Sequence, residues 1–156
     1  MSAITSPPFF EKYILPSLKK QAELLHRKNK YLLTHTDGEN RGLLELFVKS
    51  GFDVADSICP APLTSLTLKE ILRVFGGKIA VWGGIPSISV LEESMNNAEF
   101  EACIDSLFES IGKDDRVILS IADTVPPGAS FERIDRIAKK TKEFNAYRGA
   151  GHNKSS

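Results

Sequence analysis

The chain has 156 residues, 42% of them hydrophobic and 26% charged, which fits one globular domain with a buried core. Its 20 basic and 20 acidic residues balance, which excludes a broad electrostatic surface for nucleic acid or for an anionic membrane. Because the sequence has no membrane-spanning apolar run, no secretory signal and only two cysteines, Cys59 and Cys103, we expect a cytoplasmic protein with reduced thiols.

Strand-like and helical patterns alternate along the chain. Short apolar runs predict four strands, at residues 31–36, 53–58, 78–82 and 116–122. Apolar residues at spacings of three and four predict a helix before the first strand and one after each strand, at residues 7–28, 43–50, 68–75, 97–111 and 131–144. Four strands that are each followed by a helix predict an α/β protein with a parallel sheet covered by helices.

Local signals mark several boundaries of the predicted helices. Pro16 predicts a kink in the first helix, and Asn29 predicts a left-handed residue at its end. Thr67 followed by Glu70 predicts a capping box, and Asn97 is the expected N-cap of the fourth helix.

The domain organisation is simple. No shift in composition marks a linker, so we expect residues 1–146 to form one domain. From Tyr147 the sequence is polar and rich in glycine, which predicts a disordered tail at residues 147–156.

The loops after the four predicted strands are the candidate site, because parallel α/β folds bind ligands at the carboxyl ends of their strands. Polar and reactive residues gather in these loops, at 35–38, 59–62, 82–86 and 123–128. On an extended chain His35 and Asp37 share one face, where a histidine and a carboxylate can chelate a metal or form an acid–base pair. The absence of Walker, G-x-G-x-x-G and G-x-S-x-G motifs disfavours nucleotide binding and serine hydrolase chemistry.

Structural roles are the alternative for the same residues. Asp37 and Gly38 form a common turn dipeptide, and His35 can bond a loop carbonyl. Cys59 is also typical of an inert buried thiol. Trp82 and the two glycines after it can form a tight turn in which the tryptophan packs or lines a pocket.

Motifs taken in chain order resemble the C-terminal half of the uroporphyrinogen decarboxylase superfamily. The similar segments are Tyr31–Gly38, Leu43–Val54, Ala80–Ile85, Arg116–Ser120 and Val125–Pro127, and the resemblance spans residues 6–144. It implies a TIM (β/α)8 barrel, which needs about 250 residues, so the chain is expected to supply the C-terminal half as four parallel strands with outer helices. Members of the superfamily include decarboxylases of tetrapyrrole acetate side chains and zinc-dependent methyltransferases that serve corrinoid proteins.

The resemblance also implies site residues. The methyltransferases bind zinc through a histidine and cysteines, and these positions fall on His35, Asp37 and a position at or beside Asp123, with Cys59 near enough to substitute as a ligand. The decarboxylases have an Asp-Gly like the one at Asp37 but a histidine near the position of Asp123. Asp37 and Asp123 are therefore the expected catalytic residues. Substrate binding is expected at the Gly-rich turn Trp82, Gly83 and Gly84.

Three functions are compatible with these residues. Methyl transfer with a corrinoid or tetrapyrrole-type partner is favoured slightly, because His35 is retained and the family's acid-binding arginines belong to the N-terminal half. The alternatives are decarboxylation of uroporphyrinogen acetate side chains in porphyrin biosynthesis, and a non-catalytic binding protein or truncated fragment. Half a barrel would leave two open strand edges, so we expect a homo-oligomer or a complementary N-terminal half-barrel as partner.

Overall fold

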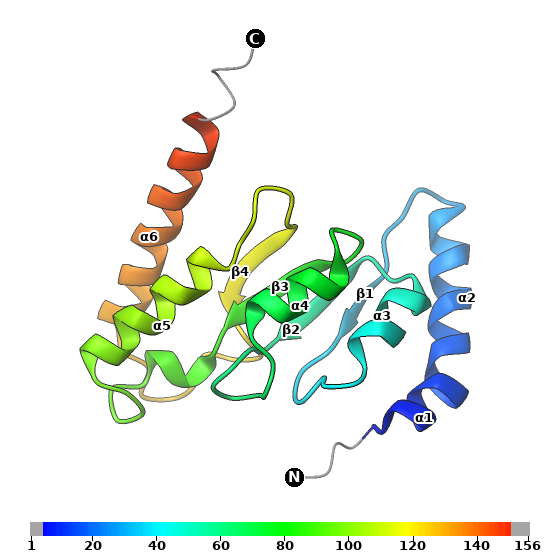
Figure 1. The fold of residues 1–156 in the computed structure, drawn as a ribbon, viewed down its shortest axis with the longest axis horizontal. Helices are drawn as coiled ribbons and strands as arrows, with labels where there is room; N and C mark the ends of the chain where they lie inside the picture. Colours follow the sequence, from blue (N-terminus) through cyan, green and yellow to red (C-terminus); the bar gives the residue numbers. More distant parts are fainter. Residues whose placement is uncertain (1–4, 151–156) are drawn as a thin grey trace.

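The computed structural model describes residues 5–150, and Figure 1 shows the strands at the centre with helices α2 and α6 at opposite ends. The elements in chain order are α1 (Pro7–Phe9), the π-helix η1 (Phe10–Ile14), α2 (Leu15–His26), β1 (Leu33–His35), α3 (Leu44–Ser50), β2 (Val54–Ile58), α4 (Leu68–Phe75), β3 (Ala80–Ile85), the 3₁₀-helix η2 (Ser87–Val90), α5 (Asn97–Glu109), β4 (Val117–Ile121) and α6 (Phe131–Ala150). None of the described helices is long and apolar enough to cross a membrane.

The four strands form one parallel sheet in the order β1-β2-β3-β4, as the sequence predicts. Strands that follow one another in the chain are also neighbours in the sheet, because each connection between them is short and contains a single α-helix or one α-helix with a short 3₁₀ turn. This architecture is consistent with part of a (β/α)8 barrel. Within the described chain, β1 pairs only with β2 and β4 only with β3, so each leaves one edge open.

The two faces of the sheet differ in burial. Ala55 and Val81 are fully buried, and they belong to the face that the helices cover. The neighbouring row of residues, one position along each strand, points to the opposite face. It contains the exposed Trp82 and Ile118, which are 39% and 50% exposed. The second face of the sheet therefore lacks a covering layer in the described chain.

The first helical segment departs from a regular α-helix before Pro16. The sequence predicts one helix over residues 7–28 with a kink, whereas the structure has α1, the π-turn of η1 and then α2. Proline has no N–H to donate to the preceding turn, and a widened turn accommodates this. The predicted left-handed residue at the end is confirmed, since Asn29 has φ of 52°.

The predicted capping box of α4 is confirmed, and the N-cap of α5 lies one residue earlier than predicted. The Glu70 N–H donates to Thr67 Oγ1 at 3.2 Å, and the Thr67 N–H donates to the Glu70 carboxylate at 2.8 Å. In α5 the cap is Asn96 and not Asn97. Asn96 exchanges the same two bonds with Glu99, and a capping box needs Glu or Gln three residues after the cap, where Asn97 would have Phe100.

Strand β3 is longer than predicted, because Gly83 and Gly84 belong to the strand and not to the loop after it. Gly83 has φ of 135°, and a Cβ atom there would lie 2.6 Å from the carbonyl oxygen of Ile58. Glycine therefore lets β3 approach the backbone of β2 where the register between the strands shifts.

Helix α6 extends further than the sequence predicts. Residues 147–150 are helical, so the predicted disordered tail begins too early. The remainder of that tail, residues 151–156, lies outside the described residues.

Candidate active site

His35 ends β1 on the uncovered face of the sheet. In the register of the strands it lies opposite Asp56 of β2, which in turn lies opposite Trp82 of β3. These side chains form one row across the sheet, with Ile118 of β4 as the next member. Because successive residues of a strand alternate between faces, this row belongs to the open face.

Asp56 holds one nitrogen of the His35 ring. Its Oδ2 lies 3.1 Å from His35 Nδ1, within hydrogen-bonding distance. Asp56 is not among the predicted site residues, although a carboxylate in the middle of an apolar strand is a usable signal. It lies inside the predicted strand 53–58, whereas the predicted site residues lie at or after the ends of strands.

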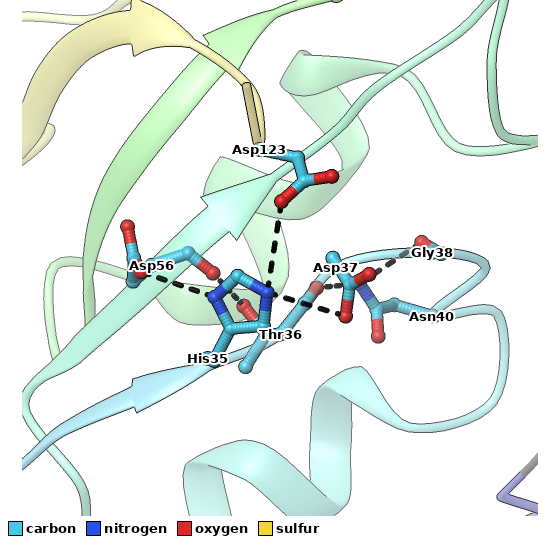
Figure 2. A network of polar contacts seen from close by, with 7 residues as sticks. All are labelled: His35, Thr36, Asp37, Gly38, Asn40, Asp56 and Asp123. Atoms are coloured by element: carbon cyan, nitrogen blue, oxygen red, sulfur yellow. Dashed lines mark hydrogen bonds and ion pairs between the residues drawn. The ribbon is translucent and has the colours of Figure 1, made fainter.

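Two further carboxylates face the other ring nitrogen. Asp37 Oδ1 lies 3.5 Å and Asp123 Oδ1 lies 3.9 Å from His35 Nε2, as Figure 2 shows. Asp37 lies two residues after the end of β1. Asp123 lies two residues after the end of β4 and has φ of 62°, in the left-handed region. The structure therefore brings together three of the four residues that the sequence predicted as metal ligands.

The carboxylates favour the charged form of the histidine. The hydrogen bond with Asp56 is the largest cause and raises the pKa of His35 above its ordinary value, burial acts in the opposite direction, and the negative charges of Asp37, Asp56 and Asp123 raise it further. Among the described residues, the ion pairs of these three carboxylates are all with His35. One histidine ring surrounded by three carboxylates makes this end of the sheet acidic.

The cluster is accessible. The side chains of His35 and Asp37 are 52% and 58% exposed, whereas Asp56, which lies deeper in the row, is 30% exposed. A substrate that approaches the open face at the carboxyl ends of the strands can reach the Nε2 side of the histidine without displacing Asp56.

Cys59 makes no hydrogen bond to the cluster among the described residues, although the charge of Asp123 is near enough to raise the pKa of its thiol. It is buried, and its thiol donates to the carbonyl oxygen of Pro60 at 3.7 Å. Burial raises the pKa of the Cys59 thiol to about 11, so it is not a ready thiolate ligand. No group of three or more His, Cys, Asp or Glu side chains among the described residues is arranged to hold a metal ion. The geometry thus gives no support to the predicted zinc site, which stays a prediction.

The three residues predicted to bind substrate have different surroundings. Trp82 lies on the open face next to Asp56 in register, and its ring is accessible from the same side as the cluster. Gly83 and Gly84 are buried in β3 and contact neighbouring strands and helices, which favours a packing role for them. Their part in substrate binding stays a prediction.

A cavity of about 400 Å³ between α5 and α6 is separate from this cluster. Its lining includes Asn97, Phe100, Arg133 and Arg136, and none of the predicted site residues. Arg133 is nearly buried there and donates to the carbonyl oxygens of Ser89, Leu91 and Met95, so it ties α6 to the loops before α5.

The profile of one protein family, Uroporphyrinogen decarboxylase (URO-D), matches residues 1–144. The chain belongs to this family. No curated protein matches the chain in sequence. Membership of the uroporphyrinogen decarboxylase family agrees with the parallel sheet and its outer helices. The His35 cluster lies at the carboxyl ends of the strands, the end at which (β/α)8 barrel enzymes carry their active sites.

Proposed function

We propose that the chain takes part in decarboxylating a pyrrole acetate substrate, of which uroporphyrinogen is the example given by the family name. The observation that supports this most directly is the position of His35. One ring nitrogen is held by Asp56, and the other faces Asp37 and Asp123 on the accessible side. This is the arrangement of a proton donor next to acceptors for N–H groups.

The chemistry needs a proton donor and a place for positive charge. The His35 imidazolium protonates a pyrrole ring carbon next to the nitrogen, which puts the positive charge on the ring, and the histidine is then reprotonated from solvent. The bond between the acetate methylene and its carboxylate breaks, carbon dioxide leaves, and the electron pair forms a double bond between the methylene carbon and the ring, which neutralises the ring. Protonation of the methylene carbon and loss of the proton first added to the ring leave a methyl group on the restored pyrrole. Asp37 and Asp123 accept the pyrrole N–H groups and stabilise positive charge on the ring.

Metal-dependent methyl transfer, which the sequence favoured slightly, has less support from the geometry. Its ligand set included Cys59, whose thiol is buried, protonated and bonded to Pro60. The zinc content of protein purified without chelator tests this alternative. Bound zinc that is lost on His35→Ala, but retained on His26→Ala, would favour methyl transfer.

The substrate's carboxylates require cations that this cluster lacks. Among the described residues, the cluster's carboxylates have His35 as their one cationic partner. We therefore propose that the open face is completed by another surface, either a second copy of the chain or a complementary N-terminal half-barrel. That surface would also exclude water from the cluster.

The experiment compares wild-type protein with His35→Gln in anaerobic incubations with uroporphyrinogen, in which products are oxidised and separated by their number of carboxyl groups. We expect turnover by wild type and a rate lower by roughly 10²–10⁴-fold for His35→Gln, as for loss of a general acid. His26→Gln is the matched control, because His26 also pairs with an aspartate, Asp53 at 2.9 Å, but lies at the end of α2.

Two results would contradict the proposal. Equal rates for wild type and His35→Gln would exclude His35 as the proton donor. If light scattering shows that the protein is an oligomer, and this protein binds the porphyrinogen without turning it over, the non-catalytic alternative is favoured.

A further inference from the structure

Two buried polar residues lie behind the exposed His35 cluster. Thr36 and Asn40 are 6% and 5% exposed, although both belong to the loop that follows β1. Buried polar groups in a loop are stable only where hydrogen bonds compensate for lost water. The hydrogen bonds of Thr36 and Asn40 therefore show which parts of the loop are held in place.

Thr36 joins the loop to β2 through a single acceptor. Its backbone N–H and its hydroxyl both donate to the carbonyl oxygen of Asp56, each at 2.8 Å. Because Thr36 follows His35 in the chain, these two bonds hold the backbones of His35 and Asp56 side by side. They account for the contact between Asp56 and His35 without help from Asn40.

Asn40 closes the turn on the opposite side of the histidine. Its amide Nδ2 donates to the carbonyl oxygen of Thr36 at 2.7 Å and to that of Gly38 at 3.3 Å. These carbonyls belong to the residues directly before and after Asp37, as Figure 2 shows. One buried amide thus bridges both sides of Asp37, while Asp37 itself makes no hydrogen bond to the loop in the described network.

We infer that Asn40 is a positioning residue of the proposed site, which holds Asp37 against His35 by closing the turn between Thr36 and Gly38. The inference rests on the proposed function only where it gives Asn40 a role in catalysis, since the hydrogen bonds of Asn40 are present in the structure without a substrate. Asn40 does not touch the face where a substrate would bind, so it acts through Asp37 and not on the reacting atoms.

The readout is the titration of His35, followed through its ring resonances by NMR. The charged groups that face the ring are Asp56 from β2, Asp37 from the loop after β1 and Asp123 from the loop after β4. If Asn40 acts through Asp37, then Asn40→Ala lowers the pKa of His35 in the wild-type background. The same substitution has no further effect when Asp37→Asn is already present.

A double-mutant cycle of Asn40→Ala and Asp37→Asn makes this comparison, and His26 provides a reference curve in the same spectra. An equal decrease in both backgrounds would overturn the inference, because Asn40 would then act by another route. No decrease in the wild-type background would overturn it as well. Asn40→Gln, which keeps the amide but displaces it by one methylene group, replaces Asn40→Ala if the alanine variant does not fold.

The cycle needs no substrate, so its outcome is separate from that of the proposed function. If the two substitutions have non-additive effects on the pKa of His35 but the protein does not decarboxylate the substrate, Asn40 remains a positioning residue and the proposed reaction is rejected. If their effects are additive and decarboxylation depends on His35, the reaction is retained and the role of Asn40 is rejected.

Discussion

Asp56 and His35 lie directly opposite each other on neighbouring parallel strands, and their side chains meet with 3.1 Å between Oδ2 and Nδ1. The pair is built into regular strand register, so its geometry depends on the sheet and not on a mobile loop. Catalytic groups on strands are held more precisely than groups on loops. Thr36 adds a second contact between the two strands, because its N–H and its hydroxyl both donate to the backbone carbonyl oxygen of Asp56.

Removing the Asp56 charge should bring His35 closer to an ordinary histidine. In Asp56→Asn the pKa of His35 should fall toward 6.5, because the hydrogen bond to a carboxylate is the largest cause of its elevation. NMR titration of the ring measures the change. A His35 titration curve that stays at its wild-type position would show that Asp37 and Asp123 alone determine the charge state.

The raised pKa of His35 also predicts how stability depends on pH. A folded-state value above the unfolded value of 6.5 means that the contribution of the charged histidine is complete below that value. It is lost as the pH rises through the folded-state pKa. The difference in unfolding free energy between wild type and His35→Gln should therefore be larger at pH 5.5 than at pH 9.

We expect this difference to be small, because the His35 side chain is 52% exposed and solvent screens its ion pairs. Urea unfolding at the two pH values measures it. A difference that grows toward pH 9 would contradict the direction of the His35 pKa shift.

Even a methyl side chain at position 83 should destabilise the fold. Gly83→Ala combines a φ of 135° with a Cβ only 2.6 Å from the Ile58 carbonyl, so we expect a loss of roughly 3 kcal/mol in the free energy of unfolding. Gly38→Ala is the matched control, because Gly38 also has a positive φ, 81°, but no atom within 4 Å of the added Cβ. Its cost should be about 1 kcal/mol. If urea unfolding shows equal losses of unfolding free energy for the two variants, the strands can move apart at Gly83 at no cost, which would contradict the prediction.

The open face and the open edges predict association. Leu33, Trp82 and Ile118 are exposed on this face, beside strand edges that can pair with another chain. Light scattering at micromolar concentration should detect dimers or larger species, and Ile118→Lys should shift them toward monomer. Phe131→Lys is the control, since Phe131 is 87% exposed on α6 and away from the sheet. A stable wild-type monomer that unfolds cooperatively would contradict the prediction.

Much of the fold could be predicted because its signals are local. The apolar runs, the capping box at Thr67 and the left-handed Asn29 each depend on a few neighbouring residues, and the structure confirms them. The order of the strands followed from short βα connections, which leave few topologies open. Errors at boundaries, such as Asn96 in place of Asn97, reflect two equivalent side chains next to each other.

Long-range contacts decided the rest. The sequence by itself determined that His35 and Asp37 lie at and just after the end of one strand, and that an acidic residue, Asp123, follows the last strand. Only the tertiary structure decided that Asp56 holds the ring, which depends on strand register, and that the Cys59 thiol is buried. The extension of β3 through Gly83 has the same origin, since the need for glycine there comes from Ile58, a residue on another strand. Register joins residues that are far apart in the chain, and no local pattern encodes it.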